Sequence, residues 1–158
     1  MIYNICKGCN YANGISIGTP HTGKTEQSYK VKFSRSCLVL PGVKDCDGDW
    51  NKLFGWSYGL HQKNSLRLAW KSMNGKIRIG WYMYEKGVRR SNGFASVDVE
   101  TVTEMSIKHF VEEGQIAFSC GDKKVFITYD TLPSWGYTLN PYYGGNCSAP
   151  ETMQIEFI

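Results

Sequence analysis

Residues 66–84 read LRLAWKSMNGKIRIGWYMY, and this stretch decides the fold class. Apolar and polar side chains alternate on both sides of Asn74-Gly75. Because successive side chains of a strand point to opposite faces, the pattern predicts two strands that each bury one face. Asn-Gly favours a two-residue hairpin, since both central positions of that turn adopt positive φ. The stretch therefore predicts an antiparallel β-sheet.

The same period of two recurs along the chain between turn signals, and it predicts about ten short strands. Beyond the hairpin block, the candidates lie at residues 2–5, 15–17, 29–40, 54–60, 105–109, 116–120, 125–129, 137–143 and 153–158. One short helical turn is expected near 47–54, with Asp47 or Asp49 as its cap. We expect an all-β, two-sheet antiparallel β-sandwich of the lectin-like jelly-roll type, and an up-and-down barrel is the alternative.

Length and charge fit a single domain over residues 1–158, with the irregular residues 1–28 as an N-terminal arm or docking segment. The formal net charge of +4 is unevenly distributed. Residues 1–90 hold 15 basic and 5 acidic side chains, whereas residues 91–158 hold 3 and 9. Such a division suits self-association or a charged partner, unless the fold interleaves the two halves.

The N-terminal residues lack a basic region followed by a long apolar run, so no secretory signal is expected. No segment reaches the roughly 18 apolar residues of a membrane span, and no membrane partner is expected. The predicted site of synthesis is therefore the cytoplasm. In that compartment free thiols are favoured over a disulfide framework for Cys6, Cys9, Cys37, Cys46, Cys120 and Cys147.

Three short motifs resemble ligand sites, and each is better explained as structure. Residues 18–25 match the phosphate-loop pattern, but a strand pattern follows where a helix is required, so no nucleotide is expected. The pair Cys6 and Cys9 is half of a zinc site without a second pair. Residues 45–49 alternate carboxylates as calcium loops do, but Trp56 stands at the twelfth position. We expect no metal and no cofactor.

Catalytic residues are not evident in this sequence. The chain shows neither a nucleophile–base signature nor two carboxylates that are singled out as a pair. The remaining candidate is the polar face of the hairpin block, a surface where exposed tyrosines beside basic groups suit sugars, phosphates or proteins. Its predicted residues, open to the alternative that a second layer covers them, are His61, Arg67, Lys71, Arg78, Tyr82 and Tyr84.

Three segments carry a resemblance to known proteins: residues 50–57 (WNKLFGWS), 64–70 (NSLRLAW) and 136–146 (GYTLNPYYGGN), with Ala149-Pro150. They resemble small lectin-like jelly-roll proteins of gut bacteria and their tailed phages. The resemblance implies a concanavalin-type sandwich in which residues 153–158 close the sheet. In phages such modules decorate capsids or fibres, and the resemblance supplies no ligand or catalytic residues.

These observations lead to three expectations for function. The first is a non-enzymatic bacteriophage virion auxiliary protein that decorates the capsid, located in the virion with capsid proteins as partners. The second is a carbohydrate-binding module that holds glycans on the aromatic and basic face. The third is an enzyme acting on polysaccharides.

Overall fold

The computed structural model describes residues 1–15, 17–39 and 48–158, which form two antiparallel six-stranded sheets. Sheet A contains, in spatial order, β1 (Ile2–Ile5), β12 (Met153–Phe157), β3 (Glu26–Phe33), β8 (Thr103–Phe110), β9 (Gln115–Cys120) and β10 (Lys123–Thr128). Sheet B contains β2 (Ile17–Thr22), β11 (Trp135–Leu139), β4 (Asn51–Ser57), β5 (Ser65–Met73), β6 (Lys76–Glu85) and β7 (Val88–Val97). The predicted all-β sandwich is confirmed.

Helix is confined to two short 3-10 turns in the described part of the chain, η1 (Ala12–Gly14) and η2 (Arg35–Cys37). Within that part, no helix has the length and apolar character needed to span a membrane.

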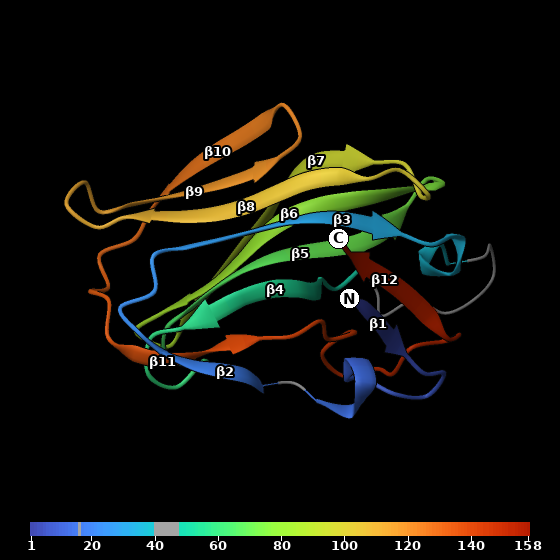
Figure 1. Cartoon of the computed structure of the whole chain (residues 1–158), viewed down its shortest axis with the longest axis horizontal. Coiled ribbons are helices and arrows are strands. Elements are labelled where there is room, and N and C mark those ends of the chain that lie inside the picture. The colour runs from blue at the N-terminus through green and yellow to red at the C-terminus, as the bar shows by residue number, and fades with distance from the viewer. Residues whose placement is uncertain (16, 40–47) are drawn as a thin grey trace.

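The two ends of the chain lie side by side in sheet A (Figure 1), where β1 pairs with β12 and the amino group of Met1 donates to the carbonyl of Phe157. The final strand β12 lies between β1 and β3, inside the sheet. Residues 1–28 supply β1 and the start of β3 to sheet A, and they supply β2 to sheet B. Whether this segment also docks to another molecule stays a prediction.

The core lies between the sheets and is built from the apolar positions of the strand pattern. Leu66, Leu68 and Trp70 of β5 are fully buried, and the Trp70 ring lies 5.4 Å from the ring of Phe33 in sheet A. The alternate residues of β5 therefore point to the outer face of sheet B. The expected division of this hairpin into an inner and an outer face is confirmed.

The prediction of a helical turn near 47–54 is wrong for the residues that the structure describes. Gly48 lies in a turn and Asn51–Ser57 is β4, while residues 45–47 lie outside the described residues. All seven residues of β4 are buried, because β4 lies in the middle of sheet B between β11 and β5. A strand buried on both faces has no amphipathic pattern that separates it from a short helix. Leu60, the last residue of the strand predicted at 54–60, lies outside β4 and is 63% exposed.

A β-bulge interrupts β4 and changes which of its side chains face outward. Lys52 pairs with Ala69 and Gly55 pairs with Arg67, so three residues of β4 advance against two of β5. An extra residue reverses the alternation on the bulged strand. Lys52 is therefore on the outer face of sheet B together with Arg67.

Gly55 permits the close approach of β4 and β5 at this bulge. A Cβ added at Gly55 would lie 1.9 Å from the carbonyl oxygen of Leu66. We expect Gly55→Ala to lower the free energy of unfolding by about 3 kcal/mol, because the backbone of β5 must shift. Denaturant unfolding measures the change.

The matched control is Gly59→Ala, a position at φ +70 with open space around it, where only the backbone conformation is strained. That control should cost about 1 kcal/mol. Equal losses in the two variants would contradict the role of the close approach.

His109 is buried between the sheets, 4% exposed, beside two tyrosines. Its Nδ1 lies 2.9 Å from the Tyr58 hydroxyl, which donates to the Lys24 carbonyl at 2.6 Å, so Nδ1–H is the donor of this pair. Burial lowers the pKa of His109 below its ordinary 6.5. The folded chain thus keeps this imidazole neutral where the unfolded chain takes up a proton.

The free energy of unfolding should therefore fall as the pH drops through 6.5, since the unfolded state then binds more protons than the folded state. His109→Gln removes one titrating group and keeps a side chain that can donate to Tyr58. We expect the variant to lose stability less steeply than the wild type over this pH range, as measured by urea unfolding at several pH values. Parallel pH profiles for the two proteins would contradict this.

Candidate functional site

The outer face of sheet B contains a pocket of about 260 Å³. Its floor is the ladder between β5 and β6, in which Arg67 pairs with Tyr82 and Ser65 pairs with Tyr84. Loops and neighbouring strands supply the walls. We call it the Arg67 pocket, and its lining residues are Tyr11, Lys52, His61, Gln62, Ser65, Arg67, Tyr82, Tyr84, Leu139 and Tyr142.

Arg67 is a buried cation without an acidic partner among the described residues. Its side chain is 8% exposed, and Nη2 donates to the Asn140 carbonyl at 2.6 Å. Nε is buried and has no hydrogen-bond partner within the described protein. Burial lowers the pKa of Arg67, although a guanidinium stays charged at neutral pH. A buried charge of this kind is costly unless something compensates it, so the pocket favours an anion.

Lys52 is the second buried cation of the pocket, 7% exposed. Its Nζ donates to the Gly144 carbonyl at 2.9 Å and lies 4.8 Å from the ring centroid of Tyr82 and 5.7 Å from that of Tyr142. Burial lowers the pKa of Lys52 to about 8, and the charge of Asp49 opposes this shift. At neutral pH most of these ammonium groups are charged. Lys52 and Arg67 thus give the pocket two positive charges.

Tyrosine hydroxyls surround the two cations. Burial raises the pKa of Tyr82 to about 12, and the ring of Tyr84 packs edge-on at 5.9 Å from that of Tyr82. Tyr142 packs against Tyr11 at 5.0 Å, and burial raises its pKa as well. Tyr82 and Tyr142 are therefore protonated at neutral pH and can donate a hydrogen bond or a proton.

His61 lies in the turn between β4 and β5, at the pocket's edge. Its Nδ1 is 2.8 Å from the Tyr137 hydroxyl, which also accepts the backbone N–H of His61 at 3.2 Å. Burial, and secondarily the charge of Arg67, lower the pKa of His61. The imidazole is thus neutral at neutral pH and is held by one of its two nitrogens.

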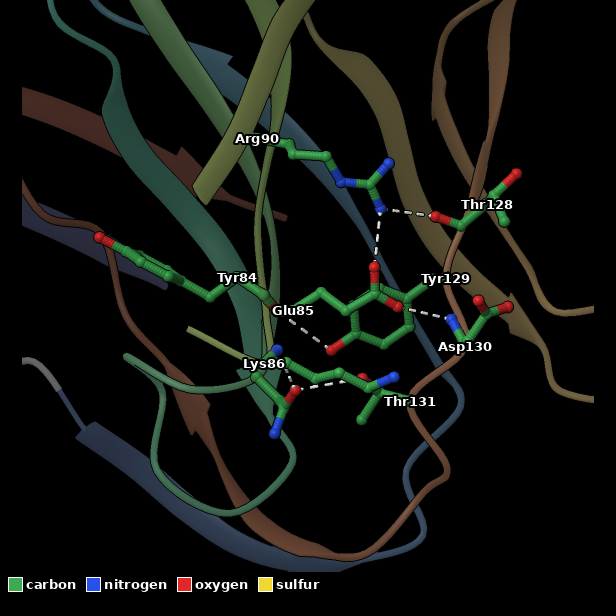
Figure 2. A network of polar contacts seen from close by, with 9 residues as sticks. Tyr84, Glu85, Lys86, Arg90, Thr128, Tyr129, Asp130 and Thr131 are labelled. Carbon is green, nitrogen blue, oxygen red and sulfur yellow. Dashed lines mark hydrogen bonds and ion pairs between the residues drawn. The ribbon is translucent and has the colours of Figure 1, made fainter. Parts of the chain in front are cut away.

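A polar network fixes the end of β6 that carries Tyr84 (Figure 2). The Tyr129 hydroxyl donates to the Tyr84 carbonyl at 3.2 Å. Next to it, Glu85 accepts from the backbone N–H of Asp130 at 2.6 Å and pairs with Arg90 at 3.1 Å. Arg90 also donates to the Thr128 carbonyl at 2.7 Å. The segment that leads from sheet A to sheet B is thereby tied to the pocket.

The structure brings together four of the six surface residues that the sequence predicts, His61, Arg67, Tyr82 and Tyr84. Lys71 and Arg78 pair with each other on the same ladder but do not line the pocket.

Trp50 covers the outer face beside these two residues. A Cβ added at Gly80 would meet its ring at 2.7 Å, and one added at Gly93 would meet it at 3.2 Å. Lys71 Nζ lies 4.5 Å from the Trp50 ring centroid and donates to the Gly48 carbonyl at 3.1 Å.

The charged and aromatic residues of the pocket that were missed from the sequence are Lys52, Tyr11 and Tyr142. Tyr142 forms isolated β-bridges to Tyr11 and to Lys52, which gather the three residues from distant segments. The signal that could have found them is weak. Tyr11 lies in the irregular N-terminal region, and Tyr142 lies in the predicted strand 137–143, whose neighbours the sequence does not show. Lys52 alternates in phase with the core residues Phe54 and Trp56.

Residues 18–25 and the pair Cys6 and Cys9 lie in the described part of the chain, whereas residues 45–47 of the carboxylate motif lie outside it. No group of three potential metal-ligating side chains occurs in the described part. β3 follows the phosphate-loop-like segment, so a strand lies where a phosphate loop requires a helix. The strand predicted over 29–40 ends at Phe33, however, and η2 follows it. Cys6, Cys9, Cys37 and Cys120 are free, whereas Cys147 is disulfide-bonded, which corrects the expectation of free thiols at that position.

Comparison with known proteins identifies the fold. No protein-family model matches the chain, and no curated protein is similar to it in sequence. Alginate lyase AlgAT5 of polysaccharide lyase family 7 superposes with a TM-score of 0.51 at 14% identity, over 99% of this chain and 74% of that chain. The alginate lyase from Corynebacterium sp. gives 0.51 at 11% identity, over 99% and 73%. The alginate lyase from Alteromonas sp. 272 gives 0.49 at 9% identity, over 82% and 66%.

These likenesses show a shared lectin-like jelly-roll sandwich, and at such identities they show the fold alone. They also overturn the predicted function. The two structures with a TM-score of 0.51 are alginate lyases, which belong to the class placed third from the sequence, so the prediction of a non-enzymatic bacteriophage virion protein is wrong. Nothing in the comparisons supports an origin in gut bacteria or phages.

Proposed function

We propose that this protein is a polysaccharide lyase that cleaves uronate chains such as alginate at the Arg67 pocket. The observation that carries the proposal is the pair of buried cations, Lys52 and Arg67, in an open pocket lined by tyrosines and a neutral histidine. The alginate lyases that share the fold support the choice of reaction and of substrate.

Cleavage of a uronate chain by β-elimination requires proton transfer at two positions and neutralisation of the carboxylate at C5. A base removes the proton at C5, the C4–O bond breaks, a double bond forms between C4 and C5, and the leaving oxygen takes up a proton. Neutralising the carboxylate at C5 acidifies the C5 proton and stabilises the charge that develops. In this pocket the guanidinium of Arg67 supplies a positive charge for that carboxylate, and Lys52 adds a second one.

The proton transfers fall to the remaining polar groups. In the tautomer in which Nδ1–H donates to the Tyr137 hydroxyl, Nε2 of neutral His61 is a free basic nitrogen, and His61 is then the candidate base. The protonated hydroxyls of Tyr82 and Tyr142 are candidate acids for the leaving oxygen. The polar network behind Tyr84 holds one wall of the pocket in place, as positioning of reacting groups requires.

Removing either cation should abolish most of the activity. The test incubates the protein with alginate and follows the ultraviolet absorbance of the new C4–C5 double bond. We expect Arg67→Gln to lower kcat/KM by about 100-fold or more, because a charge-stabilising donor is lost. Lys52→Met should act in the same direction, and His61→Gln should lower kcat by about 100-fold if it is the base.

Lys71→Gln and Arg78→Gln are the matched controls, since they remove the same charges from the same face outside the pocket. Their kcat/KM should stay within about twofold of the wild type, as expected for screened surface charges. Failure of the wild type to form unsaturated product from alginate and from polygalacturonate would overturn the proposal. So would equal losses in pocket and control variants.

The charge of Lys52 predicts a pH dependence of substrate binding. Because its pKa is lowered to about 8, the ammonium loses its proton as the pH rises through that value. KM for alginate should therefore rise several-fold between about pH 7 and about pH 8.5. Lys52→Met should have a high KM that changes little over this range. A wild-type KM that is flat across it would contradict the assignment of Lys52 to carboxylate binding.

A further inference from the structure

A second pocket, of about 360 Å³, opens at the edge of the sandwich where β1, β12 and β3 face β2 and β11. Four aromatic rings form a continuous wall of it. Phe157 lies 4.9 Å from Tyr3, 4.9 Å from Tyr29 and 5.7 Å from Phe54, and Tyr29 lies 5.0 Å from Phe54. Rings in such edge-to-face and tilted arrangements accommodate a further flat ring.

Among the described residues that line this pocket, Gln27 is the one whose side chain has a buried polar atom without a hydrogen-bond partner. The side chain points inward from β3 and is 9% exposed. Its amide nitrogen donates to the Tyr29 hydroxyl at 3.0 Å, whereas the amide oxygen is buried without a hydrogen-bond partner in the described protein. A buried acceptor without a donor is costly, so the pocket favours an occupant that donates to it.

The other amide side chains of the pocket are already engaged within the protein. Asn140 accepts from the Tyr3 hydroxyl at 3.5 Å and donates to the Ile15 carbonyl at 3.4 Å. Asn13 accepts from the backbone N–H of Asn4 at 3.0 Å and donates to the Ile2 carbonyl at 3.2 Å.

The described residues that line this pocket include no Lys, Arg, Asp or Glu side chain, in contrast to the Arg67 pocket. The amino group of Met1, which also lines the pocket, donates to the Phe157 carbonyl, so the side chains of the pocket favour a neutral occupant.

We propose that this pocket binds a neutral small molecule with a flat ring and one O–H or N–H donor, such as a phenol. The ring packs against the aromatic wall, and the donor reaches the amide oxygen of Gln27. The volume is within the range of small-molecule sites. The proposal does not depend on lyase activity, since none of the residues that carry it is assigned to the reaction.

The experiment compares phenol with toluene, two probes of similar size that differ in the donor. Titration of ¹⁵N-labelled protein is followed by NMR, with the Gln27 side-chain amide as the reporter. Toluene is the more apolar probe, so a purely apolar pocket would prefer it. We expect phenol to bind at least about tenfold more tightly, because it pairs the buried acceptor.

Gln27→Leu should remove this preference, so that toluene binds at least as tightly as phenol. Gln115→Leu removes an exposed glutamine from β9 of the same sheet and should leave the preference unchanged. If Gln27→Leu does not fold, Gln27→Met replaces it. The proposal is overturned if neither probe shifts the Gln27 amide, if toluene binds the wild type as tightly as phenol, or if the preference survives the loss of the Gln27 amide.

Discussion

The strict alternation of side chains along β5 and β6 is the constraint on which the rest of the structure depends. Leu66 and Trp70 must reach the core between the sheets, so Arg67 and its partner Tyr82 must face outward. A slip of one residue would bury the charge of Arg67 among apolar side chains and expose the core. The packing that stabilises the sandwich therefore also fixes the position of the candidate site.

Lys52 and Arg67 are buried on the outer face of sheet B without an acidic hydrogen-bond partner in the described part of the chain, which is unusual for charged side chains. The carbonyls of Asn140 and Gly144 accept from Arg67 and Lys52, which offsets part of the cost of removing them from water. Burial is the main cause of the lowered pKa of Lys52, and the charge of Asp49 offsets this effect only in part. An arrangement that is costly for stability and complementary to a carboxylate is typical of a binding site.

The sequence predicts the sandwich and part of the site because both follow from a period of two. Arg67, Tyr82 and Tyr84 share the polar parity of the 66–84 hairpin, so local alternation places them on one surface. Lys52 could not be found in this way, since it has the parity of Phe54 and Trp56 and only the bulge before Gly55 turns it outward. Tyr11 and Tyr142 come from irregular segments that meet through long-range bridges. Their position depends on tertiary packing that no local pattern records.

The incorrect expectation of a non-enzymatic protein has a chemical reason. A nucleophile with its base, or two facing carboxylates, are the patterns that indicate a hydrolase, and this sequence shows neither. Elimination at a uronate needs neither: the substrate's own carboxylate activates the proton that leaves, and the protein must supply cations and a proton shuttle. Arg67, Lys52 and the surrounding tyrosines meet that requirement with residue types that otherwise suggest a binding surface. A basic and tyrosine-rich sheet face is therefore compatible with catalysis whenever the ligand is itself a carboxylate-bearing sugar.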